Sequence, residues 1–344
     1  MENDLKNLTL TEIEPIVTNF GQKKYLAKYI FNFIHCGNVQ NISEITPLNK
    51  TFRNELAEGG FYISHLKLLE KLTDPDCTIK YLFGLSGGDR IEAVLLFDED
   101  RRTLCVSTQA GCQMNCAFCA TGKLGFKQNL SAAQIVDQVN IIEKEQGKIS
   151  NVVYMGMGEP FKNYQNVLKS VHILNSPDGK NIGIRRVTIS TCGEIPGIEK
   201  LADENIQPRL AISLNAPTDV LRTKIMPINK KCPLEQLFKA IKTYQLRTKQ
   251  RVTFEYVMIA GFNDTVLHAK MLIKRLRGIK CNVNLIEFNP HKGCEFAAST
   301  KEAIKRFASI LDTAEIETVI RFKKGRTIKA ACGQLGADWP NSAS

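Results

Sequence analysis

The sequence predicts an α/β fold, in which a partial (β/α)6 barrel follows a small helical domain and a short strand-rich connector. Two observations carry this prediction. From Arg102 onward, short strand-like runs alternate with amphipathic runs of helical length. Before Arg102, a helical stretch precedes two runs of strand character. A chain of 344 residues has room for all three parts. We therefore expect domains over residues 1–60, 61–97 and 98–335.

The first sixty residues are expected to form the helical domain. Apolar side chains between Leu26 and Ile34 recur at helical spacing, and Pro47 stands where another helix could begin. In the connector, residues 78–83 and 91–97 have the composition of strands and are separated by glycine-rich turn signals.

The barrel is expected to hold six strand–helix units. Strands are predicted at residues 103–108, 151–155, 186–190, 209–214, 252–258 and 282–288, and helices at 132–146, 164–175, 198–205, 234–246, 266–276 and, after the last strand, 301–314. Barrels of parallel strands carry their chemistry at the carboxyl ends of the strands, so the residues there are the first candidates for a functional site.

Charge and cysteine content limit the possible classes of protein. The net charge of +11 favours a polyanionic partner, nucleic acid first. Eleven cysteines, an odd number in a long chain, argue against a secreted disulfide framework and favour metal or thiol chemistry. No apolar run reaches the length of a membrane span, and the N-terminus lacks the pattern of a secretory signal. We expect a cytoplasmic protein without a membrane partner.

Three cysteines follow the first barrel strand. Cys112, Cys116 and Cys119 have the spacing CxxxCxxC, and thiolates are the usual ligands of iron–sulfur clusters. Three thiolates leave one iron of a four-iron cluster open to a small molecule. Structural zinc usually takes four ligands, and the sequence has no matching second CxxC or HxxxH. The spacing favours a [4Fe–4S] cluster over a zinc site or a chance triplet.

Polar residues stand at the other strand ends. Glycines in the loop at residues 154–160 allow close backbone approach, and its glutamate can accept from an ammonium group. Hydroxyl and amide side chains near the later strand ends suit ribose hydroxyls and adenine edges. Each of these residues has the alternative of being a capping or turn residue. The candidates are Gly158, Glu159, Ser190, Ser213, Leu214, Asn215 and Asn289.

Taken together, the motifs resemble the RlmN/Cfr family of radical S-adenosylmethionine (SAM) RNA methyltransferases. The likeness covers almost the whole chain and is most specific at residues 105–109, 112–123, 155–160, 226–229 and 331–335. It implies a radical SAM form of the barrel and an N-terminal domain that helps to bind RNA. One [4Fe–4S] cluster per chain and two SAM molecules per turnover are implied, with SAM held by the strand-end candidates.

The resemblance also implies three catalytic residues. Cys332 matches the cysteine that carries the methyl group before its transfer to an adenine carbon. Cys105 matches the cysteine that resolves the protein–RNA adduct and leaves a disulfide with Cys332. Glu92 stands at the position of a proton acceptor. A radical route suits an adenine ring carbon between two nitrogens, because such a carbon is electrophilic and cannot attack SAM directly.

Within the family, the cluster loop is closest to RlmN, whose members methylate C2 of an adenine in the peptidyl-transferase centre of 23S rRNA and C2 of an adenine in the tRNA anticodon loop. Cfr-like members methylate C8 of the same rRNA adenine. Asn215 departs from the histidine common at its position. The resemblance implies a low-potential electron donor such as flavodoxin or ferredoxin, and we expect a monomer.

Two other classes of function remain open from the sequence: a radical SAM enzyme with a substrate other than RNA, and a metal-stabilised RNA-binding protein without catalysis. RNA contacts are expected from basic residues, because phosphates dominate RNA affinity. Two basic runs are candidates for such contacts: Lys323, Lys324, Arg326 and Lys329, and Arg247, Lys249 and Arg251.

Overall fold

One large sheet organises the molecule. The computed structural model describes residues 3–291, 293–321 and 324–339, and in this part of the chain ten strands hydrogen-bond in the order β1-β2-β3-β4-β7-β8-β9-β10-β11-β12. The strands are β1 (Lys67–Thr73), β2 (Ile79–Gly84), β3 (Arg90–Asp98), β4 (Arg101–Cys105), β7 (Asn151–Tyr154), β8 (Val187–Thr191), β9 (Arg209–Ser213), β10 (Val252–Met258), β11 (Cys281–Glu287) and β12 (Thr318–Arg321).

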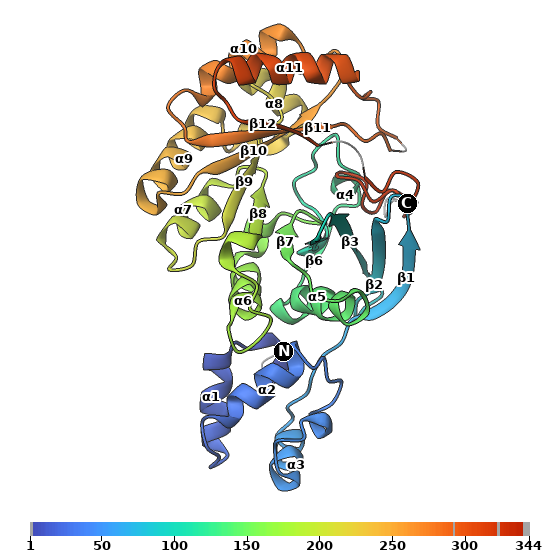
Figure 1. The fold of residues 1–344 in the computed structure, drawn as a ribbon, viewed down its shortest axis with the longest axis vertical. Coiled ribbons are helices and arrows are strands. Elements are labelled where there is room, and N and C mark those ends of the chain that lie inside the picture. The colour runs from blue at the N-terminus through green and yellow to red at the C-terminus, as the bar shows by residue number, and fades with distance from the viewer. Residues whose placement is uncertain (1–2, 292, 322–323, 340–344) are drawn as a thin grey trace.

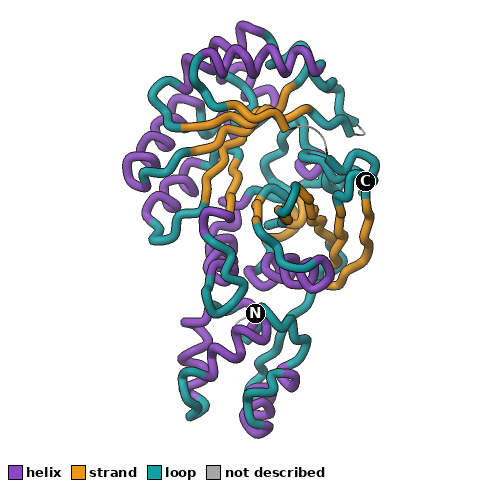
Figure 2. Tube along the Cα trace, viewed as in Figure 1, coloured by secondary structure: helices purple, strands orange, loops and turns teal. Residues whose placement is uncertain are grey.

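Helices cover the outer face of the parallel part of this curved sheet, whereas β1 and β2 form an edge without a helix outside them (Figures 1 and 2). Strands β1 to β4 form an antiparallel meander, and the pairs from β4–β7 to β11–β12 are all parallel. The barrel helices are α4 (Ala120–Lys123), α5 (Ala132–Gln146), α6 (Tyr164–Asn175), α7 (Ile195–Asp203), α8 (Asp219–Ile225), α9 (Leu234–Thr248), α10 (Val266–Leu276) and α11 (Lys301–Thr313). Short 3-10 turns occur at η3 (Pro160–Asn163), η4 (Ile184–Arg186) and η5 (Pro227–Lys230).

The predicted fold class is confirmed, since an α/β sheet of strand–helix units follows an N-terminal helical region. A strand is found within a few residues of each of the six predicted barrel strands. The prediction that the strand near residue 288 is the last was wrong, because β12 adds a further parallel strand beside β11. Its four residues are all at least partly exposed, so they lack the buried apolar run that marks the other barrel strands.

The N-terminal region holds α1 (Leu10–Asn19), α2 (Leu26–His35) and α3 (Lys50–Glu58), with 3-10 turns at η1 (Leu5–Asn7) and η2 (Ile42–Glu44). The expected helix start at Pro47 was wrong. The helix begins at Lys50 because the Asn49 side chain accepts a hydrogen bond from the Phe52 N–H (2.8 Å) and so caps the first turn. In the connector, β2 and β3 match the two predicted strands, and the largely exposed β1 was not foreseen.

The C-terminal segment joins the two ends of the open sheet. After β12 the chain returns past α4 toward β1 to β3 (Figure 1). There Asp74, in the turn between β1 and β2, accepts hydrogen bonds from the N–H (2.8 Å) and hydroxyl (2.7 Å) of Thr327. Asp76 accepts from the Gly325 N–H (2.8 Å). The segment that carries Cys332 is therefore fixed by contacts to the antiparallel strands as well as to the barrel.

A single hydrophobic core cluster includes residues of the N-terminal helices and of the barrel. At their junction, Lys6 of η1 forms an ion pair with Asp137 of α5, and both side chains are almost fully buried. The second carboxylate oxygen of Asp137 accepts from the Leu66 N–H (2.7 Å). Among the described residues, no helix is long and apolar enough to cross a membrane.

We expect Lys6→Met to lower the free energy of unfolding by about 3–5 kcal/mol, because it leaves the Asp137 carboxylate buried without its cation. Urea denaturation followed by circular dichroism measures the change. The matched control is Lys24→Met, which breaks the exposed pair between Lys24 and Glu14 and should cost about 0–1 kcal/mol. Equal losses in the two variants would contradict the assignment of Lys6 as a buried anchor.

Candidate active site

A short antiparallel pair holds the cysteine loop. Strands β5 (Gln109–Gly111) and β6 (Phe126–Asn129) pair on either side of it, and the Cys112 N–H donates to the Gly125 carbonyl (2.9 Å) at its base. Gly111 has a φ of +69°, and a Cβ there would lie 1.8 Å from the Gly125 oxygen. Only glycine fits this position, so the sequence closes the loop tightly and presents its three cysteines together.

The three cysteine side chains are half-buried, free thiols. Burial raises the pKa of Cys112 to about 12 and that of Cys116 well above its usual value, and the neighbouring thiols of the loop add to the rise for Cys116. The thiols therefore lie close enough to interact electrostatically. Across residues 3–291, 293–321 and 324–339, however, no three histidine, cysteine, aspartate or glutamate side chains converge on a point that would suit a single metal ion.

This donor set fits an iron–sulfur cluster in its chemistry. Three thiols on one loop are the ligands such clusters use, and a four-iron cluster is larger than one ion, so its ligands stand farther apart than those of a single zinc. Partly buried thiols with raised pKa values become thiolates when cationic metal compensates their charge. Cys192 and the apolar side chains of Met226 and Phe288 belong to the same buried cluster as the loop.

Glu159 lies beside the cysteine loop, held by backbone groups. Its carboxylate oxygens accept from the N–H groups of Phe161 (3.1 Å) and Cys192 (2.8 Å). Burial raises the pKa of Glu159, and these two N–H groups oppose the rise. Gly158 before it has a φ of +100°, and a Cβ there would lie 2.5 Å from the Gln109 side chain. The loop after β7 is thus packed directly on β5, which places the carboxylate next to the cysteines.

The ends of β8 and β9 carry the next candidates. Ser190 lies in β8 and Ser213 ends β9, and both are half-buried. Leu214 is buried, and its N–H donates to the Glu255 carbonyl (3.0 Å). The Asn215 side chain is bound within the protein, because its Oδ1 accepts from the Val257 N–H (2.9 Å). The backbone of Asn215 has a φ of +59°, a conformation that asparagine tolerates better than most residues.

Arg222 of α8 connects these strand ends and was missed by the sequence analysis. Its side chain is fully buried. The guanidinium donates to the carbonyls of Leu214 (3.1 Å) and Cys192 (2.5 Å) and to the Asn229 side chain (3.0 Å). One charged group therefore joins the loops after β8 and β9. Its position in a short helix of mixed polarity carries no signal that distinguishes it from a solvated arginine.

The segment around Cys332 lies directly on the cysteine loop. The Ala120 N–H donates to the Gly333 carbonyl (2.8 Å), and the Thr121 hydroxyl donates to the Leu335 carbonyl (2.8 Å). The Asn289 side chain donates to the Cys332 carbonyl (3.1 Å). Cys332 itself is solvent-exposed. Residues far apart in the sequence are thus brought together, and the segment that carries Cys332 packs on the loop that carries the three cysteines.

Cys105 lies at the end of β4, half-buried. Burial, with a smaller contribution from the nearby Cys332 sulfur, raises its thiol pKa to about 12. Both cysteines are free thiols in this structure, so the predicted disulfide is absent between them here.

Glu92 of β3 contacts the same C-terminal segment. Its two carboxylate oxygens accept from the Gly336 N–H (2.8 Å) and from the Lys80 ammonium (3.2 Å). All of these groups are buried, and burial raises the pKa of Glu92, although Lys80 opposes the rise. The carboxylate thus lies next to the loop that follows Cys332 and has a cation beside it.

The two basic runs predicted for RNA binding are largely paired with acids. Arg247 and Arg251 pair with Asp203 and Glu317. In the second run, Arg326 lies 3.8 Å from the carboxylate of Glu287, Lys329 pairs with Asp338, and Lys324 donates to the Phe97 carbonyl. Lys323 lies outside the described residues. These pairs reduce the charge that either run offers to a phosphate.

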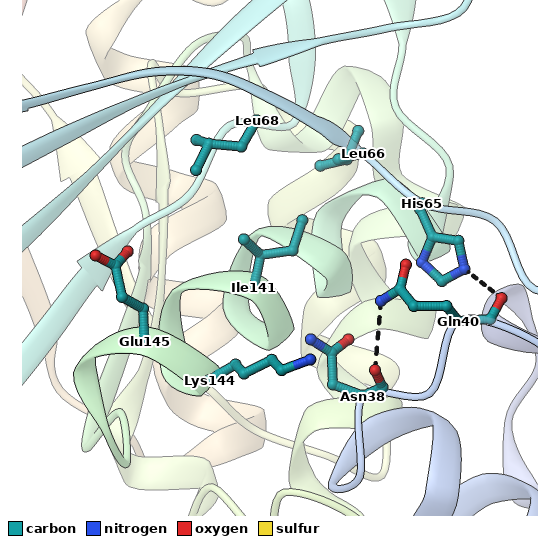
Figure 3. A pocket seen from close by; sticks show the side chains of 8 residues that line it. All are labelled: Asn38, Gln40, His65, Leu66, Leu68, Ile141, Lys144 and Glu145. Carbon is teal, nitrogen blue, oxygen red and sulfur yellow. Dashed lines mark hydrogen bonds between the residues drawn. The ribbon is translucent and has the colours of Figure 1, made fainter. Parts of the chain in front are cut away.

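A small pocket of about 340 Å³ lies between the N-terminal region, β1 and α5 (Figure 3). Its polar groups bind one another, as His65 contacts the Gln40 carbonyl (2.8 Å) and Gln40 donates to the Asn38 carbonyl (3.4 Å). No cysteine lines it. The candidate chemistry therefore belongs to the barrel mouth and not to this pocket.

Comparison with known proteins identifies relatives of nearly the full length. Residues 106–272 match the radical SAM superfamily, and residues 3–60 match the ribosomal RNA large subunit methyltransferase N-terminal domain. The chain is 45% identical to the probable dual-specificity RNA methyltransferase RlmN of Thermoanaerobacter sp. (strain X514), over 96% of this chain and 97% of the relative. It is 43% identical to the dual-specificity RNA methyltransferase RlmN of Syntrophobacter fumaroxidans, over 97% of this chain and 98% of that relative.

A solved structure agrees with these relatives. The radical SAM methyltransferase from Sphaerobacter thermophilus superposes with a TM-score of 0.92 at 41% identity, and the match covers 97% of this chain and 99% of that one. The similarity includes both the N-terminal helical region and the strand–helix units of the barrel.

Proposed function

We infer the activity of this protein from its family, since the chain belongs to the RlmN family of radical SAM RNA methyltransferases. We propose that it methylates C2 of an adenine in the peptidyl-transferase centre of 23S rRNA and C2 of an adenine in the tRNA anticodon loop. The observation that carries the proposal is the hydrogen bond from Ala120, next to Cys119, to Gly333, next to Cys332 (2.8 Å). This hydrogen bond joins the loop that carries three cysteines to the segment that carries the exposed thiol of Cys332.

Cys112, Cys116 and Cys119 would hold one [4Fe–4S] cluster. When bound, the cluster supplies the electron that cleaves SAM and yields a 5′-deoxyadenosyl radical. Around it, the carboxylate of Glu159 and the open backbone at Gly158 would receive the amino group of SAM. Ser190, Ser213, Leu214, Asn215 and Asn289 would line the rest of the SAM site. Their shared position at the ends of β8, β9 and β11 supports this assignment.

Cys332 would carry the methyl group. Its thiolate would attack the methyl carbon of a first SAM. A carbon–sulfur bond would form on the protein, the methyl–sulfonium bond would break, and S-adenosylhomocysteine would leave. A second SAM is consumed in the radical step, which makes two per turnover. Solvent exposure of Cys332 supports this role, because the thiol must meet SAM and an RNA base in turn.

Cys105 would release the product. The 5′-deoxyadenosyl radical would remove one hydrogen atom from the S-methyl group, and the resulting methylene radical would bond to C2 of the adenine. The adduct would then lose the C2 proton and its odd electron, which the oxidised cluster could take back. The Cys105 thiolate would next attack the Cys332 sulfur and form a disulfide. The bond between the Cys332 sulfur and the methylene carbon would break. Its electron pair would pass to the adenine, and protonation of the methylene carbon would complete the methyl group. Glu92 would accept the proton that leaves C2. Its raised pKa suits a base, and its contact with Gly336 places it beside the carrier loop.

The parts of the chain would divide this work. Residues 1–60 would bind RNA, residues 61–97 would connect this domain to the barrel, and residues 98–335 would form the catalytic barrel. An external donor such as flavodoxin or ferredoxin would supply electrons to the cluster. We place the enzyme in the cytoplasm, where its RNA substrates are found, and propose that it acts as a monomer.

Nucleoside mass spectrometry of 23S rRNA and tRNA tests the proposal. The host is a strain without its own C2 methylase, with or without this gene. We expect 2-methyladenosine in both RNAs only when the gene is present. Finding 8-methyladenosine instead would assign the protein to C8 chemistry. Finding neither, with a folded protein that contains iron and sulfide, would contradict the RNA substrate.

A further inference from the structure

A second surface near the barrel mouth is rich in uncompensated positive charge. A groove of about 750 Å³ lies between α9, α10 and the segment that follows β9. Phe238 and Met271 contribute apolar surface to it, and Glu235 is the one carboxylate among its lining residues. Its cations are Lys239, Lys242, Lys274, Arg275 and Arg277, all exposed. We call this surface the α9–α10 groove.

The charges of the α9–α10 groove have few partners of their own. In the part of the chain that the structure describes, none of its five cations forms an ion pair within 4.0 Å of a carboxylate. Arg275 donates instead to the Pro217 carbonyl (3.2 Å). Arg247, near the other end of α9, does pair with an acid. Like charges so close together repel one another, so a bound polyanion would stabilise this arrangement.

The groove extends to the loop that follows β9. Pro217 and Thr218 line it and stand two and three residues after Asn215, at the carboxyl end of β9. Thr218 also caps α8, since its hydroxyl accepts from the Leu221 N–H (3.3 Å). At the other end of α8, the Ile225 carbonyl accepts from Ala117 of the cysteine loop (2.9 Å). The loop at the edge of the groove is therefore linked through α8 to the loop that carries the three cysteines.

We propose that the α9–α10 groove binds the phosphodiester backbone of the RNA substrate next to the modified base. This inference rests on the proposed function and names a contact surface for it. Lysine and arginine side chains around a depression suit successive phosphates. Phe238, the one aromatic residue among those that line the groove, is only 8% exposed and offers little ring surface for a base to stack on. The contacts would position RNA without reading its sequence.

The test replaces three of the lysines, as Lys239→Ala/Lys242→Ala/Lys274→Ala, in the full-length holoenzyme. The readouts are tRNA affinity across a salt series and single-turnover methylation. Loss of about three phosphate contacts should reduce the slope of log K against log salt by about 2–3 and weaken binding by roughly 10–100-fold at low salt. The methylation rate at saturating tRNA should stay unchanged, because no catalytic group is touched.

Two controls separate position from total charge. Lys301→Ala/Lys305→Ala/Arg306→Ala removes three exposed cations of α11 that do not line the groove, and it should keep the wild-type slope. The triple lysine-to-arginine variant of the groove should keep it too. If the groove variant binds tRNA as the wild type does, the groove is not the contact, although the proposed function stands. If the wild type neither binds nor methylates tRNA, both proposals fall.

Discussion

We expect Cys332→Ala to abolish RNA methylation, with a loss of more than about 1000-fold, while the protein keeps its fold and its iron. The side chain is exposed and makes no packing contribution to the core, so its removal should cost little stability. Its sulfur would form the only covalent bond between the protein and the transferred carbon. Because alanine offers no nucleophile for SAM, the reaction would stop before any carbon reaches the RNA.

Iron and sulfide analysis, together with mass spectrometry of the RNA, measures these outcomes. Cys116→Ala is the complementary variant, and it should lose the cluster and the activity together. Cys36→Ala, at an exposed thiol after α2, serves as the control that keeps both. Methylation by the Cys332→Ala protein would remove the carrier role, and loss of iron from that variant would make Cys332 part of the cluster site.

The strand–helix order of the barrel could be predicted because each unit is local. A strand such as Val252–Met258 is a short apolar run, and a helix such as Val266–Leu276 repeats its apolar positions every three or four residues. β12 and β1 escaped the same reasoning, since both are largely exposed and their pairing depends on neighbours far along the chain. Pattern alone therefore underestimates strands at the edges of a sheet.

The site could be predicted in its parts but not in its connections. The cysteine spacing and the motif around Glu159 are continuous in sequence, so they are visible there. Arg222 is different, because its role depends on carbonyls of Cys192 and Leu214 that folding brings together. Likewise, nothing in the sequence brings Lys80 to Glu92. The register of β2 and β3 does, because it sets Lys80 opposite Val94 and Glu92 opposite Leu82, so that the two side chains are diagonal neighbours.

Variants of the Lys80–Glu92 ion pair can distinguish a structural role of Glu92 from a chemical one. We expect Lys80→Met to destabilise the protein by about 3–5 kcal/mol, because it leaves Glu92 buried without its cation. Lys80→Met/Glu92→Gln should recover most of that stability, since it removes both charges. The glutamine oxygen can still accept from the Gly336 N–H and so hold the loop.

The activity of the double variant then decides what Glu92 does. If its carboxylate accepts the substrate proton, glutamine cannot replace it, and the methylation rate should stay about 100–10,000-fold below the wild type in a stable protein. The pH profile gives a second readout. Since burial raises the pKa of Glu92, the wild-type rate should fall as pH drops through that raised value, where the carboxylate becomes protonated. A double variant that is stable and fully active, without that acid limb, would show that Glu92 only anchors the turn after Cys332.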